Sequence, residues 1–161
     1  MPDLTVSDSS PIISFARAKK LHLIQKVCNE IIIPPAVYDE IVVRGKGKPG
    51  AEEIKNASWV TIRKPTNRIE VEKLGRQFDR GESKAIILAE ELKAILLADE
   101  RIIIKEARIR NIQIISTHLI LVEARRKNLI KNLRKELDEL IASGFRTTPE
   151  LIKETLQKAG E

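Results

Sequence analysis

Short apolar runs that alternate with helical stretches are the feature of this sequence that most constrains its fold. The stretch after Gly81 has the clearest helical spacing, with Ala85, Ile86, Ala89 and Leu92 on one face. Runs of β-prone residues predict strands at 4–6, 30–33, 59–62, 95–97 and 113–115. Strands separated by helices predict a parallel α/β sheet that is covered on both faces.

Proline and capping residues indicate where several helices begin. Ser10 is the expected N-cap of the first helix, with Pro11 at its first helical position, and the apolar spacing continues to Leu21. Pro34 and Pro35 stop the second strand and open another helix. Further helices are expected near residues 50–56, after Gly81, from about 101 to 110 and after Thr117.

The C-terminal segment, residues 131–161, predicts two helices beyond the alternating pattern. One carries an apolar stripe that includes Leu133 and Leu137, and the other begins at a Thr148 cap. We see no second domain, so we expect a single domain over residues 1–161 with 131–161 packed on it as a helical extension. The apolar stripes suit a homodimer contact, and packing on the chain's own sheet explains them equally well.

Composition narrows the function classes. The 161 residues are 42% hydrophobic and 32% charged, which is typical of a soluble globular protein, and no signal peptide or membrane span is evident. Only 3% are aromatic, which disfavours base stacking on aromatic platforms. The single cysteine, Cys28, excludes an internal disulfide and suits a reducing cytoplasm. The net charge of +6 is compatible with a phosphate-rich partner such as RNA.

Two of the four candidate carboxylates follow strands, where a parallel sheet places its ligands. Asp8 follows the first strand and Asp99 follows the strand at 95–97, and ligands bind beyond the carboxyl ends of such strands. Glu82 lies in the first turn of the helix that leads into the strand at 95–97. Glu40 flanks the apolar stripe of the helix that opens at Pro34 and Pro35. Carboxylates brought this close repel unless a cation compensates them, and oxygen ligands alone favour Mg²⁺ or Mn²⁺.

Each of these acids also has a purely structural interpretation. Asp8 could be a turn residue that prepares the Ser10 cap, and Asp99 could cap the helix that follows it. Glu82 could be a favourable first-turn acid, and Glu40 could lie on a solvated helix face. The conjunction favours function, because Asp8, Glu82 and Asp99 map to one rim of the predicted sheet.

Basic residues gather in one glycine-rich loop. Arg44, Lys46 and Lys48 could grip RNA phosphates there, and a mobile solubilising loop is the competing interpretation. The loop lacks the Gly-Lys-Ser/Thr of a P-loop. His22 and His118 are the only histidines and lie far apart, which disfavours a histidine-based metal site.

Several segments, in order along nearly the whole chain, resemble one prokaryotic branch of PIN-domain proteins. They are VSDSSPII (6–13), IPPAVYDEI (33–41), GESKAI (81–86), LADER (97–101) and SGFR (143–146). The resemblance implies a three-layer α/β/α sandwich with a five-stranded parallel sheet. It also implies metal-dependent cleavage of RNA. Many members of this family are toxins that a partner antitoxin neutralises, often as homodimers.

The resemblance implies carboxylate ligands at Asp8, Glu40, Glu82 and Asp99. We expect Asp8, Glu82 and Asp99 to hold Mg²⁺ or Mn²⁺, with Glu40 binding or orienting the attacking water. We expect Ser9, Ser10 and Thr117 to surround these ligands and orient them without binding the ion directly.

One departure from the branch pattern motivates a second hypothesis. Thr117 stands where PIN nucleases often carry a further acid, with His118 beside it, and a hydroxyl is a weaker ligand than a carboxylate. The alternative is therefore a catalytically inactive PIN-like module that binds RNA or protein. One residue also reads as deleted before Asp99, which leaves Glu100 as a rival for that ligand position.

Overall fold

The computed structural model describes residues 3–161 and contains a five-stranded sheet in the order β3-β2-β1-β4-β5. All neighbouring strands are parallel. The strands are β1 (Thr5–Ser7), β2 (Ile31–Ile33), β3 (Val60–Ile62), β4 (Ile95–Leu97) and β5 (Ile114–Ile115). The sheet confirms the five strands and the parallel pairing that were predicted.

Helices connect these strands and continue beyond the last one. They are α1 (Ser9–Arg17), α2 (Leu21–Cys28), α3 (Pro35–Tyr38), the π-helical turn η1 (Asp39–Val43), α4 (Ala51–Lys55), α5 (Arg68–Leu74), α6 (Arg80–Leu92), α7 (Arg101–Ile109), α8 (Thr117–Arg126), α9 (Leu133–Ala142) and α10 (Pro149–Lys158). Among residues 3–161, every helix is too short or too polar to cross a membrane.

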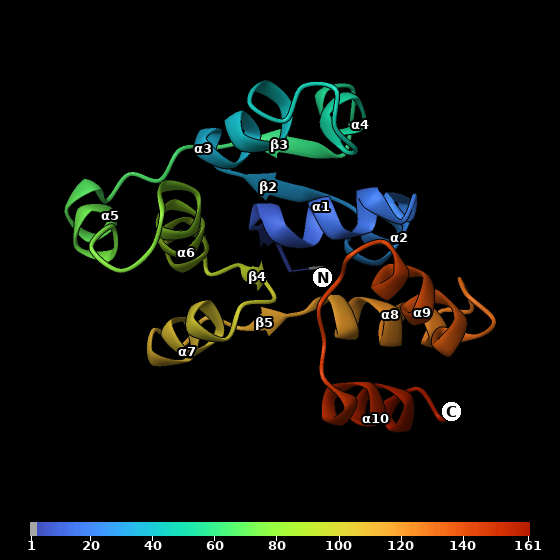
Figure 1. Ribbon diagram of the computed structural model, residues 1–161. Coiled ribbons are helices and arrows are strands. Elements are labelled where there is room, and N and C mark those ends of the chain that lie inside the picture. The colour runs from blue at the N-terminus through green and yellow to red at the C-terminus, as the bar shows by residue number, and fades with distance from the viewer. Residues whose placement is uncertain (1–2) are drawn as a thin grey trace.

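Alternation along the strands produces two hydrophobic cores, one on each face of the sheet. Ile31, Ile33 and Leu97 pack into the core formed with α1, α2, α8 and α9. Ile32 and Leu96 pack into the opposite core with α5, α6 and α7. Figure 1 shows α5, α6 and α7 on one side of the strands and α2, α8 and α9 on the other. The predicted α/β/α sandwich is confirmed.

The first helix differs from the prediction at both ends. Asp8, with an extended backbone, occupies the N-cap position, so the helix begins at Ser9 rather than after a Ser10 cap. Pro11 is tolerated inside the first turn because the first four N–H groups of a helix have no intrahelical acceptor. The helix ends at Arg17, and a turn with Lys19 at φ 59° separates it from α2. Apolar spacing alone does not reveal such a break.

Other helix boundaries also differ from the prediction. The helix that opens at Pro35 changes into the π-helical turn η1 after Tyr38. The charged connection before Gly81 contains α5, which Asn67 caps by accepting a hydrogen bond from the N–H of Glu70. Gly81 itself lies inside the first turn of α6.

The two C-terminal helices pack against the core of the chain. α9 contacts α8 and α1, and α10 contacts α8. The predicted cap of α10 is confirmed, since the Thr148 hydroxyl accepts a hydrogen bond of 3.2 Å from the N–H of Leu151. Residues 144–146 of the loop between α9 and α10 line a cavity together with Ser9 and Asp99, which follow β1 and β4.

Candidate active site

The candidate site lies where the chain reverses its direction of travel across the sheet. β1 has β2 on one side and β4 on the other, which defines the topological switch point of the sheet. Ser7 pairs in register with Leu97, and the N–H of Asp8 donates to the Leu97 carbonyl at 3.0 Å. Asp8 and Asp99 therefore leave neighbouring strands at the same edge, which is the crevice that ligands occupy in such folds.

Asp8 is a deeply buried acid surrounded by like charges. Its side chain is 2% exposed, and its Oδ1 has no hydrogen-bond partner among residues 3–161. Its pKa is raised to about 7, mainly by desolvation on burial; the N–H of Ser9 opposes this rise, and the charges of Glu82, Asp79 and Glu40 add to it. The surroundings therefore favour a neutral carboxyl unless a cation is present.

Glu82 belongs to a capping box at the start of α6. Its N–H donates to the carboxylate of Asp79 at 2.8 Å, and the N–H of Asp79 donates to Oε1 of Glu82 at 2.9 Å. Burial raises the pKa of Glu82, and the charges of Asp79 and Glu100 add to the rise. We did not predict Asp79 as a site residue, although an acid three residues before Glu82 is the sequence signal of such a cap.

Asp99 turns toward the start of α8. Leu97 points toward the α8 core and Ala98 toward the α6 core, so Asp99 continues the alternation toward α8. Its carboxylate accepts two hydrogen bonds from Thr117, one of 2.7 Å from the N–H and one of 2.6 Å from the hydroxyl. Burial nevertheless raises the pKa of Asp99.

Thr117 therefore holds Asp99 at the N-terminus of α8, where the helix dipole favours a carboxylate. The structural alternative for Asp99, a cap of the following helix, does not hold, because the N-cap position of α7 is Glu100.

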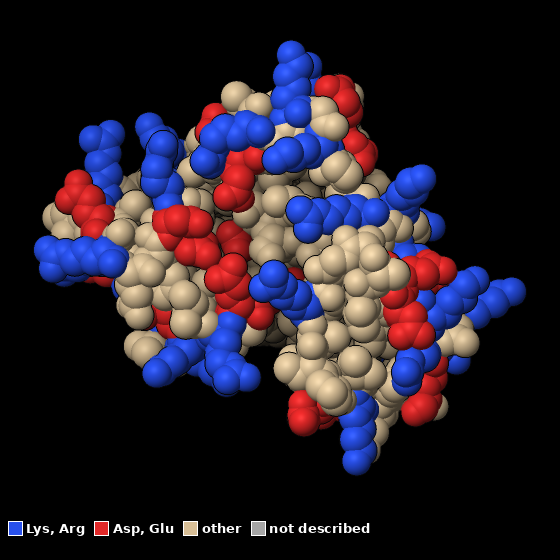
Figure 2. Space-filling model, in the orientation of Figure 1, with Lys and Arg blue, Asp and Glu red and all other residues tan. Residues whose placement is uncertain are grey.

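Glu40 lies on a cavity of about 680 Å³ that we call the rim cavity. Ser9, Ser10, Asp99 and Glu100 also line it. Figure 2 shows acidic side chains gathered in the middle of this face of the molecule, with basic side chains around them. The structure thus brings every predicted acid to one end of the sheet.

Two arginines that we did not predict as site residues also line the rim cavity. Arg17 comes from the end of α1 and Arg146 from the loop before α10. Arg17 Nη1 lies 3.6 Å from the place where a Cβ on Gly144 would be, so the two segments meet here. Arg146 ends the SGFR segment of the family resemblance, but no local pattern assigns a role to it or to Arg17, because only the fold brings them to the acids.

The predicted basic loop lies beside the site. Arg44 forms an ion pair with Asp39 at 3.2 Å and lines a small cavity together with Glu40. Lys46 and Lys48 are exposed to solvent. A role of this loop in RNA binding stays a prediction.

The donor set fits a hard divalent cation in its chemistry. All candidate ligands are carboxylate oxygens, and the buried Oδ1 of Asp8 lacks a partner in the described part of the chain. As the side chains are placed, no three His, Cys, Asp or Glu residues within 3–161 form a group that could hold a metal ion. Glu82 is engaged by its cap and Asp99 by Thr117. Metal binding by Asp8, Glu82 and Asp99 therefore stays a prediction.

The fold and the site define a parallel α/β protein with an acidic rim at its switch point. The chain belongs to the PIN-domain family, whose model matches residues 4–161. PIN domains are generally nucleases that use divalent metal ions.

Among solved structures, the chain is similar to a PilT N-terminus domain protein from the hyperthermophilic archaeon Sulfolobus solfataricus. The two share 16% sequence identity with a TM-score of 0.48, over 90% of this chain and 97% of that one. A search among curated proteins returned no match.

Proposed function

We propose that this protein is an endoribonuclease that depends on Mg²⁺ or Mn²⁺ and hydrolyses RNA phosphodiesters. The observation that carries the proposal is the buried carboxyl of Asp8. Its Oδ1 has no partner among the residues that the structure describes, and the nearby charges of Glu82, Asp79 and Glu40 are all acidic. A cation is the partner that such a group lacks. Membership of a family of nucleases supports the same conclusion.

The site residues would have different roles, according to where they lie. Asp8, Glu82 and Asp99 would hold the ion, and Glu40 on the wall of the rim cavity would orient the attacking water. Thr117 fixes the orientation of Asp99 through its two hydrogen bonds. When bound, the ion supplies positive charge that stabilises the charge developing on the phosphodiester.

The decisive experiment is the substitution Asp8→Asn, which removes a charge with little change of shape. We expect the rate of RNA cleavage in Mn²⁺ to fall by about a hundredfold or more. Mutation of residues that only hydrogen-bond to metal ligands typically lowers metal affinity or activity by about 10–100-fold, and loss of a ligand should cost more. Asp138→Asn is the matched control, since Asp138 is an exposed acid of α9. If Asp8→Asn cuts RNA as fast as the wild type, the proposal is wrong.

The second candidate is a catalytically inactive module that binds RNA or protein. Thr117 in place of an acid favours it, as does the lack of a ready metal-binding group within residues 3–161. Calorimetry with Mn²⁺ separates the two functions. A nuclease binds the ion and Asp8→Asn abolishes the binding, whereas an inactive module gives no heat that depends on Asp8.

We further propose that the protein acts as a toxin, neutralised by an antitoxin protein, and that it assembles as a homodimer. Exposed apolar residues on α7, Ile102 and Ile109, offer a contact surface. Expression in a bacterial host should arrest growth, and Asp8→Asn should relieve the arrest. Light scattering after gel filtration tests the dimer.

A further inference from the structure

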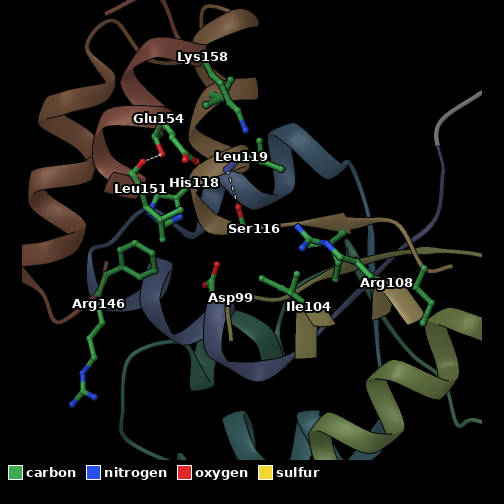
Figure 3. Close-up of a pocket in the computed structure, with 15 residues that line it drawn as sticks. Asp99, Ile104, Arg108, Ser116, His118, Leu119, Arg146, Leu151, Glu154 and Lys158 are labelled. Carbon is green, nitrogen blue, oxygen red and sulfur yellow. Dashed lines mark hydrogen bonds between the residues drawn. The ribbon is translucent and has the colours of Figure 1, made fainter. Parts of the chain in front are cut away.

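A second cavity adjoins the acidic site and has no role in the function proposed so far. It has a volume of about 420 Å³ and lies between α7, β5, α8 and α10, so we call it the α10 cavity (Figure 3). Asp99, Phe145 and Arg146 line both this cavity and the rim cavity. The two spaces are therefore neighbours that meet at Asp99.

The walls of the α10 cavity combine apolar surface with positive charge. Ile104, Ile114 and Val122 supply apolar side chains, and Arg108 and Lys158 supply cations. The volume falls in the range of small-molecule sites, which are typically apolar with a few charged groups. A planar base attached to a phosphate has this combination of properties.

His118 gives the cavity a fixed flat group. Its Nε2 shares a hydrogen bond of 2.7 Å with the Thr147 hydroxyl, and its ring lies 5.3 Å from that of Phe145 at a tilt of 55°. Figure 3 shows His118 reaching the cavity from α8 and Lys158 from α10, while Asp99 points in from the opposite wall. An imidazole held in this way offers a face on which a base can stack.

The distribution of charge suits a nucleic-acid strand that crosses from one cavity to the other. The acids of the rim repel phosphates, but Arg17 and Arg146 line the rim cavity, and Arg108 and Lys158 line the α10 cavity. Glu154 also lines the α10 cavity, and its carboxylate can accept a hydrogen bond from the amino group of a base. Cations therefore flank the acids along one path.

We propose that the α10 cavity binds the nucleotide of the RNA substrate that flanks the scissile phosphate. The base lies against His118 and the apolar wall, and Arg108 and Lys158 bind a phosphate of the strand. The inference rests on the proposed function, because that function supplies the RNA strand and its scissile phosphate. Binding of a nucleotide to this cavity is testable without any cleavage.

The first test is NMR titration of the full-length protein with the four ribonucleoside 5′-monophosphates in the absence of divalent metal. We expect saturable shifts of the methyl signals of Ile104 and Ile114. The double variant R108A/K158A should lose them, and the control R101A/K153A should keep them. Arg101 and Lys153 are exposed cations of the same two helices that do not line the cavity. Absence of shifts for every nucleotide overturns the proposal.

The second test compares, in Mn²⁺, a substrate that has a nucleotide beside the scissile phosphate with one that has none. For an RNA of ten nucleotides, kcat/KM of R108A/K158A should fall at least about tenfold below that of R101A/K153A, because two charge-assisted contacts are lost. For bis(4-nitrophenyl) phosphate, a phosphodiester with no nucleotide to occupy the α10 cavity, the two variants should be equal. Equal rates on the RNA overturn the inference.

The two tests separate the possible failures. If the wild type cleaves no RNA but binds nucleotides in the α10 cavity, the proposed nuclease function fails and the nucleotide site stands. If the protein cleaves RNA but the double variant behaves like its control in both tests, the nuclease stands and the cavity serves something else, such as a protein partner.

Discussion

A carboxyl group buried as deeply as that of Asp8 is normally paired or fully hydrogen-bonded. Here one oxygen has no partner among residues 3–161, and the surrounding acids add repulsion. The group thus resists ionisation while the site is free of metal. Two consequences at the scale of single residues are testable.

The first concerns the dependence of stability on pH. The pKa of Asp8 is about 7 in the folded state, above its ordinary value of 3.8, so the folded protein binds this proton more tightly. The associated stability is fully present below pH 3.8 and is lost as pH rises through 7. At pH 8 we expect the free energy of unfolding of the metal-free wild type to be lower than that of Asp8→Asn by on the order of 4 kcal/mol.

Urea unfolding in EDTA at several pH values measures this difference in the free energy of unfolding. It should shrink steadily as the pH is lowered from 8 toward 4, whereas Asp138→Asn should follow the wild type throughout. A difference that stays constant with pH would contradict the assignment of the titration to Asp8.

The second consequence concerns Thr117, whose hydroxyl donates to Asp99 at 2.6 Å. Thr117→Val keeps the shape of this buried residue but removes the donor. We expect RNA cleavage and Mn²⁺ affinity to fall by about 10–100-fold, since partners of metal ligands contribute to that extent. Thr117→Ser should restore both, and a valine variant with unchanged Mn²⁺ affinity would show that the contact is only structural.

At the scale of secondary-structure elements, the site depends on where strands end and helices begin. The strand pattern and the acids that follow β1 and β4 could be predicted, because parallel strands place their carboxyl ends at one edge. The side that each acid faces could not be predicted. That depends on strand boundaries to within one residue, and in the structure Asp99 turns toward Thr117 of α8.

Other elements escaped prediction for different reasons. The break at Lys19 depends on a backbone conformation with positive φ that apolar spacing does not encode. We expected this helix to begin after Gly81, whereas it begins at Arg80 with Asp79 as its N-cap, so the contribution of Asp79 was not predicted. Arg17 and Arg146 reach the site only through long-range packing of α1 against the C-terminal segment.

The capping box of α6 yields a prediction at this scale. Asp79→Ala removes the cap and one of the charges near Asp8, so it should lower the stability by about 1 kcal/mol. It should also lower the pKa of Asp8, which NMR titration of the carboxyl can follow. Asn67→Ala, which removes the cap of α5, should reduce stability similarly while leaving that pKa unchanged. An unaltered pKa in Asp79→Ala would remove Asp79 from the site.

At the scale of the whole molecule, the acidic rim belongs to a protein with a net charge of +6. Basic side chains surround the acids on the face shown in Figure 2. The long-range field therefore attracts a polyanion, while the local field at the rim attracts a cation. RNA and the metal ion would be drawn to the same end of the sheet by opposite charges.

This arrangement predicts strongly salt-dependent RNA binding to which Arg17 contributes. Arg17→Ala should reduce the slope of log K against log salt for single-stranded RNA by about 0.7, the value for one phosphate contact. Lys26→Ala is the matched control, since Lys26 is an exposed cation of the neighbouring α2 that does not line the rim cavity. Equal slopes for both variants would exclude Arg17 from the RNA path.

The hydrogen bond from the N–H of Asp8 to the carbonyl of Leu97 has a consequence for how such a chain can diverge. It ties together two acids that lie far apart in the sequence, so loops between them can lengthen or shorten without changing their separation. A single residue inserted directly after Leu97 would instead turn the next acid from α8 toward α6. Relatives of this protein should therefore vary freely in their loops and keep a constant length between the end of β4 and their acid.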